Sequence, residues 1–260
     1  MSRNFELLQQ AGVDLSGGVA GRFEVPFGIA IPTKRARDRA HVASQRPADL
    51  SRASREETLR LVQSVFLLRE VTEEGRVVVF ASINPRSGCS RVCSQAAQVL
   101  AESVPGSVCL VDANFREPSL QASVTRNNHY GLADALRTSQ PIRSYAKPLQ
   151  RENLWLISCG SGSEQTVGLL HSDSARQRID DLRREFNYIL IDAPPLNAYS
   201  EGVALGQFSD GLVLVLEANS TRRDASCRIA ERLRAMQVNI LGAVLNKRTF
   251  PIPDALYRRL

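Results

Sequence analysis

Short apolar runs recur along the chain from residue 76 onward, and helix-like stretches separate most of them. The runs are rich in Val, Leu and Ile and lie at residues 76–82, 107–113, 153–159, 188–194, 211–218 and 240–246. The clearest helical stretches lie at residues 92–103, 174–185 and 222–236. Near-continuous apolar strands that alternate with helices are typical of a parallel sheet covered on both faces. The sequence therefore predicts an α/β fold of this kind.

A change of pattern near residue 50 predicts two parts in the chain. The stretch SREETLRLVQSVFLL combines a Ser cap, acidic residues in the first turn and an apolar face of Leu59, Val62 and Phe66, which predicts the start of a helix. Residues 1–50 are rich in Gly, Pro, Ser and Arg, a composition that buries little surface. We expect a flexible segment at 1–50, with a short helix in MSRNFELLQQAG, and a domain at 51–260. Within that segment, RFEVPFGIAIP is apolar enough to lie on the domain or on a partner.

Composition narrows the classes of partner without choosing one. Hydrophobic residues make up 43% of the 260 residues, and the formal net charge is +6. A basic balance suits an anionic lipid surface, an acidic partner segment or nucleic acid. No strip of interleaved basic and aromatic residues indicates base stacking, so we expect no nucleic-acid partner. No apolar run approaches the ~20 residues of a membrane span.

The five cysteines and three histidines show no metal-binding or disulfide pattern. No CxxC pair is present, and the histidines are scattered along the chain. The sequence therefore predicts neither a zinc site nor a disulfide framework. The odd number of cysteines and the lack of a signal peptide favour the cytoplasm.

The stretch ASINPRSGCSR at residues 81–91 lies where a phosphate-binding loop would lie. A buried strand is expected before it and a helix after it, so free backbone N–H groups and the positive end of the helix dipole face the turn. The usual loop ends Gly-Lys-Ser/Thr, and its Lys reaches the outer phosphates. Here the stretch ends Gly88-Cys89-Ser90. The pattern predicts an anion site that lacks its usual cation.

Acidic residues follow two further apolar runs. Asp112 and Asn114 come at the end of one run, and Asp192 comes at the end of another. Ligands of open parallel sheets bind at the carboxyl ends of the strands. Mg²⁺ prefers hard oxygen ligands, and in P-loop proteins an Asp at such a strand end holds it. An isolated Asp after a strand is more often a turn residue, but all three motifs in this order indicate P-loop ancestry.

These motifs carry a resemblance. Residues 57–248 resemble the cytoplasmic domain of bacterial tyrosine kinases, a family of capsule and exopolysaccharide synthesis in the same broad class as the Min and Par ATPases. The similar stretches are ETLRLVQ, FASINPRSGCSR, VCLVDANFREPSL, GLADALR, FNYILIDAPPL, SDGLVLVLEANSTRRDA and LGAVLNKR. The resemblance implies a P-loop NTPase fold of the ParA-like, or SIMIBI, type.

The resemblance also implies roles for individual residues and ATP or ADP with Mg²⁺ as cofactor. The implied catalytic residues are Asp112, Asp192 and Arg116. The implied Mg²⁺ ligands are Ser90, Asp112 and Asp192. The implied nucleotide-binding residues are Arg86, Ser87, Gly88, Cys89, Ser90, Arg91 and Asn246. The implied surface for ring assembly consists of Glu57, Arg60 and Gln63, and the implied phosphorylation site is Tyr257.

The chain departs from the pattern of this family at charged positions. The family's loop reads Pro-Gly-Glu-Gly-Lys-Ser/Thr, whereas this chain has Arg86 in place of the first Gly and Cys89 in place of the Lys. Asn114 replaces the second Asp of the family's Asp-x-Asp-x-Arg motif. Gln63 replaces the last Arg of its Glu-x-x-Arg-x-x-Arg helix, and Tyr257 stands where the family has a tyrosine cluster.

The lost charges are expected to affect catalysis more than binding. A charge-assisted hydrogen bond contributes roughly 1.5–3 kcal/mol, so losing one weakens nucleotide binding by about one or two decades. Phosphoryl transfer depends almost entirely on positioned charge at the transition state. Two alternatives remain at the loop. Arg86 or Arg91 could supply the missing charge, and the Cys89 thiol at a helix N-terminus could be reactive, although a small residue tolerated after the loss of Lys is the simpler interpretation.

The sequence thus predicts a degenerate, kinase-like P-loop protein of polysaccharide synthesis or export. We expect it to act at the cytoplasmic face of the membrane as a regulatory partner of a membrane polysaccharide co-polymerase or export protein. Weak self-assembly is expected, because Gln63 replaces an arginine. The alternatives are an active tyrosine autokinase and a Min/Par-like positioning ATPase, and Asn84 in place of that group's extra loop Lys disfavours the latter.

Overall fold

The computed structural model describes residues 28–32, 52–68, 74–120, 130–161 and 164–248. Their strands form one eight-stranded sheet in the order β1-β8-β7-β2-β6-β3-β5-β4. All neighbouring strands are parallel except the short β4, which runs antiparallel to β5. The strands are β1 (Gly28–Pro32), β2 (Arg76–Ser82), β3 (Val108–Asp112), β4 (Lys147–Pro148), β5 (Leu154–Ile157), β6 (Tyr188–Ala193), β7 (Gly211–Glu217) and β8 (Ile240–Arg248).

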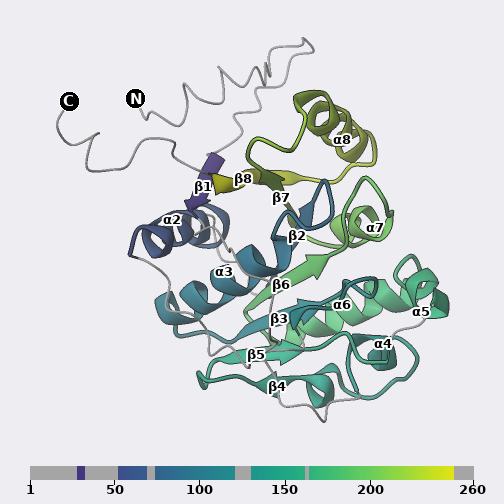
Figure 1. Ribbon diagram of the computed structural model, residues 1–260. Helices are drawn as coiled ribbons and strands as arrows, with labels where there is room; N and C mark the ends of the chain where they lie inside the picture. The colour runs from purple at the N-terminus through teal and green to yellow at the C-terminus, as the bar shows by residue number, and fades with distance from the viewer. Residues whose placement is uncertain (1–27, 33–51, 69–73, 121–129, 162–163, 249–260) are drawn as a thin grey trace, which may run out of the picture.

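Helices cover both faces of this sheet (Figure 1). One face is covered by α2 (Arg52–Val62), the π-helical turn η1 (Gln63–Leu67) and α3 (Cys89–Ser103). The other face carries α4 (Leu132–Ala135), the 3₁₀ turn η3 (Ile142–Tyr145), α6 (Asp173–Glu185), α7 (Glu201–Gln207) and α8 (Arg223–Ala235), with α5 (Glu164–Leu169) beside α6. The predicted α/β fold, with a mainly parallel sheet between helices, is confirmed.

The central strands are apolar because both of their faces are buried. Along β2, alternate side chains enter two separate cores: Val77 and Val79 pack with the α6 and α7 side, and Val78 and Phe80 pack with the α2 and α3 side. All four of these side chains have no exposed surface. Burying one such side chain contributes about 1.5–3 kcal/mol. The near-continuous apolar run in the sequence is the direct consequence of these two cores.

All six strands expected from the apolar runs are present, as β2, β3, β5, β6, β7 and β8. The strand β1 is an addition that the sequence pattern did not predict. It lies within the apolar stretch RFEVPFGIAIP and pairs in parallel with β8, Gly28 opposite Ala243 and Ile31 opposite Asn246. The boundary expected near residue 50 stays a prediction, and the helix expected in MSRNFELLQQAG lies outside the described residues.

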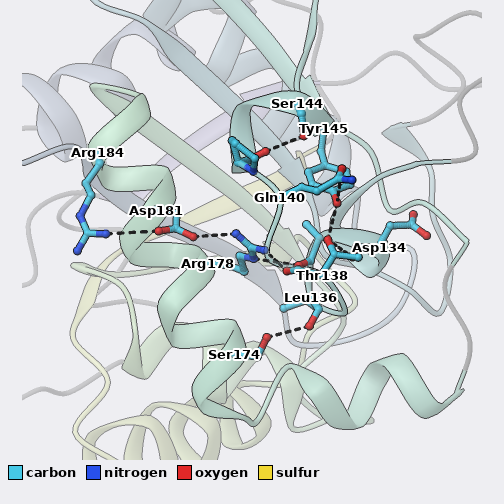
Figure 2. Close-up of polar contacts among 12 residues, drawn as sticks. Asp134, Leu136, Thr138, Gln140, Ser144, Tyr145, Ser174, Arg178, Asp181 and Arg184 are labelled. Atoms are coloured by element: carbon cyan, nitrogen blue, oxygen red, sulfur yellow. Dashed lines mark hydrogen bonds and ion pairs between the residues drawn. The ribbon is translucent and has the colours of Figure 1, made fainter.

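A buried arginine fixes α6 against the segment that follows α4. Arg178 is 7% exposed, and its guanidinium donates to the carbonyls of Ala135 and Thr138 and to the Asp181 carboxylate. Figure 2 shows this arrangement, with Asp181 placed between Arg178 and Arg184. Each of the three donor atoms of Arg178 thus has an acceptor, which a buried charge requires. We interpret this cluster as a structural support for α6.

Candidate nucleotide-binding site

Three strand ends meet at the centre of the sheet. β2 lies between β7 and β6, and the chain leaves β2 through residues 83–88 to enter α3. Asp112 of β3 and Asp192 of β6 are partners in the register of the neighbouring strands, and Phe80 of β2 is opposite Asp192 on the other side. The loop after β2 and the two predicted aspartates therefore lie together at the carboxyl ends of the central strands, where ligands of open α/β sheets bind.

The loop has the backbone shape of an anion cradle. Gly88 has φ +83° and lies directly before the 15-residue helix α3, whose first N–H groups face the turn. Arg86 also lies in the left-handed region, with φ +61°. This is the position where a glycine was expected by resemblance, so the structure explains that glycine by its backbone angle. The Ser87 hydroxyl donates to the Asn84 carbonyl at 2.8 Å, which closes the turn.

Two consecutive residues of β8 donate hydrogen bonds to the backbone carbonyls of this loop. The Asn246 side chain, 2% exposed, donates from Nδ2 to the Ser87 carbonyl at 2.8 Å. A Cβ at Gly88 would overlap this Nδ2 atom, so only glycine fits beside it. Lys247 Nζ donates to the Arg86 carbonyl at 2.6 Å and pairs with Glu217 at 3.0 Å. Asn246, predicted as a nucleotide-binding residue, thus contacts the loop itself.

Cys89 occupies the predicted lysine position without supplying a charge. Its side chain is 8% exposed, and it faces the carboxylate of Asp192. Burial, followed by the nearby Asp192 charge, raises the pKa of the Cys89 thiol well above its usual value. Burial raises the pKa of the Cys93 thiol in the same way. A thiol held in its neutral form is a poor nucleophile, so the alternative of a reactive Cys89 is not supported.

Asp192 is a buried acid that forms no ion pair with the described residues. It has no exposed surface, and neither carboxylate oxygen has a well-formed hydrogen bond to the described residues, although the Ser90 hydroxyl and the Cys89 thiol face it. Burial raises the pKa of Asp192 to about 7, and the facing Ser90 hydroxyl lowers it only in part. A buried carboxylate left unpaired is costly. Such a group points to a cation that the protein would bind.

Asp112 lies beside Asp192 and is better satisfied. Its two oxygens accept from the backbone N–H groups of Asn114 at 3.1 Å and Leu120 at 3.2 Å. Burial nevertheless raises its pKa to about 6. Among the described residues no group of three or more His, Cys, Asp or Glu side chains could hold a metal ion. Two carboxylates and the Ser90 hydroxyl fit Mg²⁺ as hard oxygen donors, provided that phosphate and water complete the shell.

The other two residues of the second acidic motif are engaged in local contacts. The Asn114 side chain accepts from the Glu117 backbone N–H at 3.2 Å, so it caps the turn after β3. Arg116 pairs with the buried Glu201 at 3.3 Å, and its guanidinium carbon lies 4.7 Å from the centre of the Tyr199 ring. The structure therefore places Arg116 beside Glu201, the first residue of α7.

The remaining predicted site residues lie on the surface or outside the described chain. Arg86 of the loop and Arg91 of α3 are exposed. On α2 and η1, Arg60 and Gln63 are exposed and Glu57 is half-buried. Tyr257 falls outside the described residues. Sequence reasoning missed Lys247, which lies 161 residues from Arg86 and reaches the loop through a left-handed backbone with φ +57°.

Relatives of the chain are bacterial tyrosine kinases and polysaccharide transport proteins. It is 23% identical over 190 residues to the tyrosine-protein kinase YwqD of Bacillus subtilis, covering 73% of this chain and 80% of YwqD. It is 28% identical over 177 residues to the succinoglycan biosynthesis transport protein ExoP of Rhizobium meliloti, covering 67% of this chain. That match spans 22% of ExoP. No protein-family model matches the chain.

Solved structures agree on the fold. The kinase domain of the Escherichia coli tyrosine kinase ETK superposes with a TM-score of 0.74 at 23% identity, over 86% of this chain and 92% of that domain. The septum site-determining protein MinD of Pyrococcus horikoshii, in complex with Mg-ADP, superposes with a TM-score of 0.58 at 18% identity, over 71% of this chain and 76% of MinD. The homologues are bacterial tyrosine kinases, and the fold is that of a P-loop NTPase.

Proposed function

We propose that this chain is a degenerate, tyrosine-kinase-like P-loop protein of exopolysaccharide or capsule synthesis or export. It acts at the cytoplasmic face of the membrane as a regulatory partner of a polysaccharide co-polymerase, and it binds ADP or ATP with Mg²⁺ weakly. The observation that carries this proposal is Cys89. A neutral, buried thiol lies where a lysine ammonium would reach the phosphates.

Binding and catalysis separate at this site because they depend on different groups. The loop N–H groups, the α3 dipole and the Asp112 and Asp192 carboxylates can still hold a nucleotide with its metal. Transfer of a phosphoryl group needs positive charge placed on the outer phosphate in the transition state. Cys89 supplies none, and Asn114 is committed to capping a turn. The site therefore favours a binding protein over a kinase.

The proposed partner follows from the relatives and from the chain itself. ExoP is named a biosynthesis transport protein for succinoglycan, and the matched part is a small share of it. Within the described residues no helix is both long and apolar enough to cross a membrane. We propose that the partner of this chain is a membrane-embedded transport component. Its contact should not require nucleotide, because the replaced residues Cys89 and Asn114 belong to the nucleotide site, whereas the strands and helices of the fold are all present.

The test compares Mg-ADP affinity and ATPase rate in the wild type, Cys89→Lys, Asn114→Asp and the double variant. We expect Cys89→Lys to bind Mg-ADP ~10–100-fold more tightly, the gain from one charge-assisted hydrogen bond. Turnover should stay at background in both single variants. If Cys89→Lys alone hydrolyses ATP as fast as the double variant, the role given to Asn114 is wrong.

Two arginine variants control for a substitute charge. Arg86→Ala and Arg91→Ala should leave Mg-ADP affinity within about twofold of the wild type, because both side chains are exposed and surface charges contribute little. A loss of tenfold or more in either variant would show that an arginine has replaced the lysine.

The proposed partner is tested by a pull-down from cell membranes, which measures how much partner the protein captures. The pull-down uses the wild type and Asp192→Ala, each with and without ATP. Capture that requires ATP or intact Asp192 would contradict a nucleotide-independent partner.

A further inference from the structure

The phosphate loop and the carboxyl end of β8 meet through two residues with unusual backbones. Arg86 of the loop has φ +61° and Lys247 of β8 has φ +57°. Non-glycine residues in this region are uncommon, and each costs about 1 kcal/mol or more in strain. Lys247 Nζ donates to the carbonyl of Arg86 itself, at 2.6 Å. Two strained residues in direct contact indicate a conformation that the surrounding structure maintains.

The Lys247 ammonium is held in place from β7 as well. Glu217, the last residue of β7, accepts from Nζ at 3.0 Å, and its side chain is 23% exposed. Glu217 is the register partner of Asn246 across β7 and β8. Its own backbone N–H is bonded to the Thr221 hydroxyl at 2.9 Å, which fixes the turn that follows β7. The cation is therefore anchored to the sheet and aimed at the loop.

Asn246 completes the contact one residue earlier. Its amide donates to the Ser87 carbonyl at 2.8 Å, next to the carbonyl that Lys247 holds. We call Asn246, Lys247 and Glu217 the β8 clasp. The clasp donates to two successive loop carbonyls, those of Arg86 and Ser87, and so fixes the backbone of the turn directly before α3. A loop held in this way keeps its cradle shape without a phosphate inside it.

We propose that the β8 clasp is a positioning device that keeps the phosphate loop in its anion-binding conformation in a protein whose loop has no lysine. In a loop with lysine, the bound phosphate and the lysine hold each other. Here Cys89 makes no such contact, and the β8 clasp supplies the order from outside. The inference rests on the proposed function only in taking Mg-ADP as the ligand. Lys247 acts through the backbone of the loop, to which it donates, so we assign it the role of a positioning residue.

The test measures amide hydrogen exchange of residues 83–92 by mass spectrometry in nucleotide-free protein. Lys247→Ala should exchange about tenfold faster in this peptide, the effect of losing one charge-assisted hydrogen bond. Lys247→Arg should restore slow exchange, because a guanidinium can also donate to a carbonyl and pair with Glu217. Lys147→Ala is the matched control, since Lys147 lies on β4 at the opposite edge of the sheet. It should leave the loop unchanged.

A second readout links the loop to its ligand. Mg-ADP should bind more weakly to Lys247→Ala than to the wild type, and arginine at 247 should restore the affinity. Loop exchange that is unchanged in Lys247→Ala, or that arginine fails to restore, would overturn the proposal. The exchange measurement needs no nucleotide and no partner. A protein that proved to be an active kinase would overturn the proposed function and leave this result intact.

Discussion

At the scale of single residues, the site keeps its two aspartates but has lost the lysine that would supply positive charge. Asp112 and Asp192 remain side by side, but the group that faces Asp192 is the neutral thiol of Cys89. Burial raises the pKa of both carboxyl groups, to about 6 and about 7. Two buried acids that form no ion pair with the described residues reduce the stability of the fold. We expect such a site to take up a cation together with its ligand.

The cysteines give a direct prediction at this scale. Cys89, Cys93, Cys109 and Cys159 are buried, and burial raises the pKa of each thiol. Cys227 on α8 is only partly buried. Titration of the native protein with Ellman's reagent should therefore show one fast thiol, which Cys227→Ser removes, and the other four should react only after unfolding. Fast labelling of Cys89 in native protein would restore the reactive-thiol interpretation.

The raised pKa of Asp192 predicts how stability depends on pH. In the folded state the Asp192 carboxyl group keeps its proton up to about pH 7, whereas the ordinary pKa of an aspartate is 3.8. Between these values the folded state binds more protons than the unfolded state, so the free energy of unfolding falls as pH rises. Each unit of pKa shift corresponds to ~1.4 kcal/mol. Asp192→Asn should raise the melting temperature at pH 8 without metal, and the gain should shrink toward pH 4.

The exposed Asp224 on α8 provides the control for this prediction. Asp224→Asn should change the melting temperature little at either pH, because an exposed carboxyl group has no burial to relieve. A gain from Asp192→Asn that is the same at pH 4 and pH 8 would show that the effect is not electrostatic. A loss at pH 8 would show that Asp192 is paired in the apo protein.

At the scale of elements, the helix that carries the predicted assembly surface is present, but Gln63 stands where the resemblance leads us to expect a charged arginine. Arg60 and Gln63 are exposed at the end of α2 and the start of η1, and burial raises the pKa of Glu57 to about 6. Removing one member of a charged interface pair typically costs ~2–5 kcal/mol. We expect the wild type to be a monomer or loose dimer by light scattering and Gln63→Arg to form larger assemblies.

A matched substitution separates a specific contact from added charge. Gln177→Arg places the same change on the exposed surface of α6, on the other face of the sheet. It should leave the molar mass unchanged. A stable ring in the wild type would contradict the importance given to Gln63, and equal assembly of the two variants would show that net charge alone drives association.

The elements themselves were largely predictable from the sequence. The buried central strands read as apolar runs because both of their faces are covered, and α3, α6 and α8 followed from their spacing. The strand β1 was hidden in a Gly- and Pro-rich stretch, because a five-residue edge strand is defined by its pairing with β8 and not by its own pattern. The π-helical turn η1 continued the pattern of α2 and left no separate signal.

At the scale of the whole molecule, the order of motifs along the sequence predicted that Asp112 and Asp192 belong to the site. It did not predict the contact between β8 and the loop. Asp112 and Asp192 follow apolar runs, and parallel strands bring such ends together. The contact of Lys247 with Arg86 joins residues 161 positions apart. It depends on two left-handed backbones that no residue type signals, since neither is glycine. Such contacts require the folded structure to be seen.

The central claim is that this P-loop protein has lost phosphoryl transfer while keeping its fold. The most direct measurement is the intact mass of the purified full-length protein after incubation with Mg-ATP, with phosphotyrosine blotting in parallel. We predict no added phosphate in the wild type, because Cys89 places no charge on the outer phosphate. Robust phosphate incorporation that requires Mg²⁺ and is lost in Asp192→Ala would contradict the account and identify an active kinase.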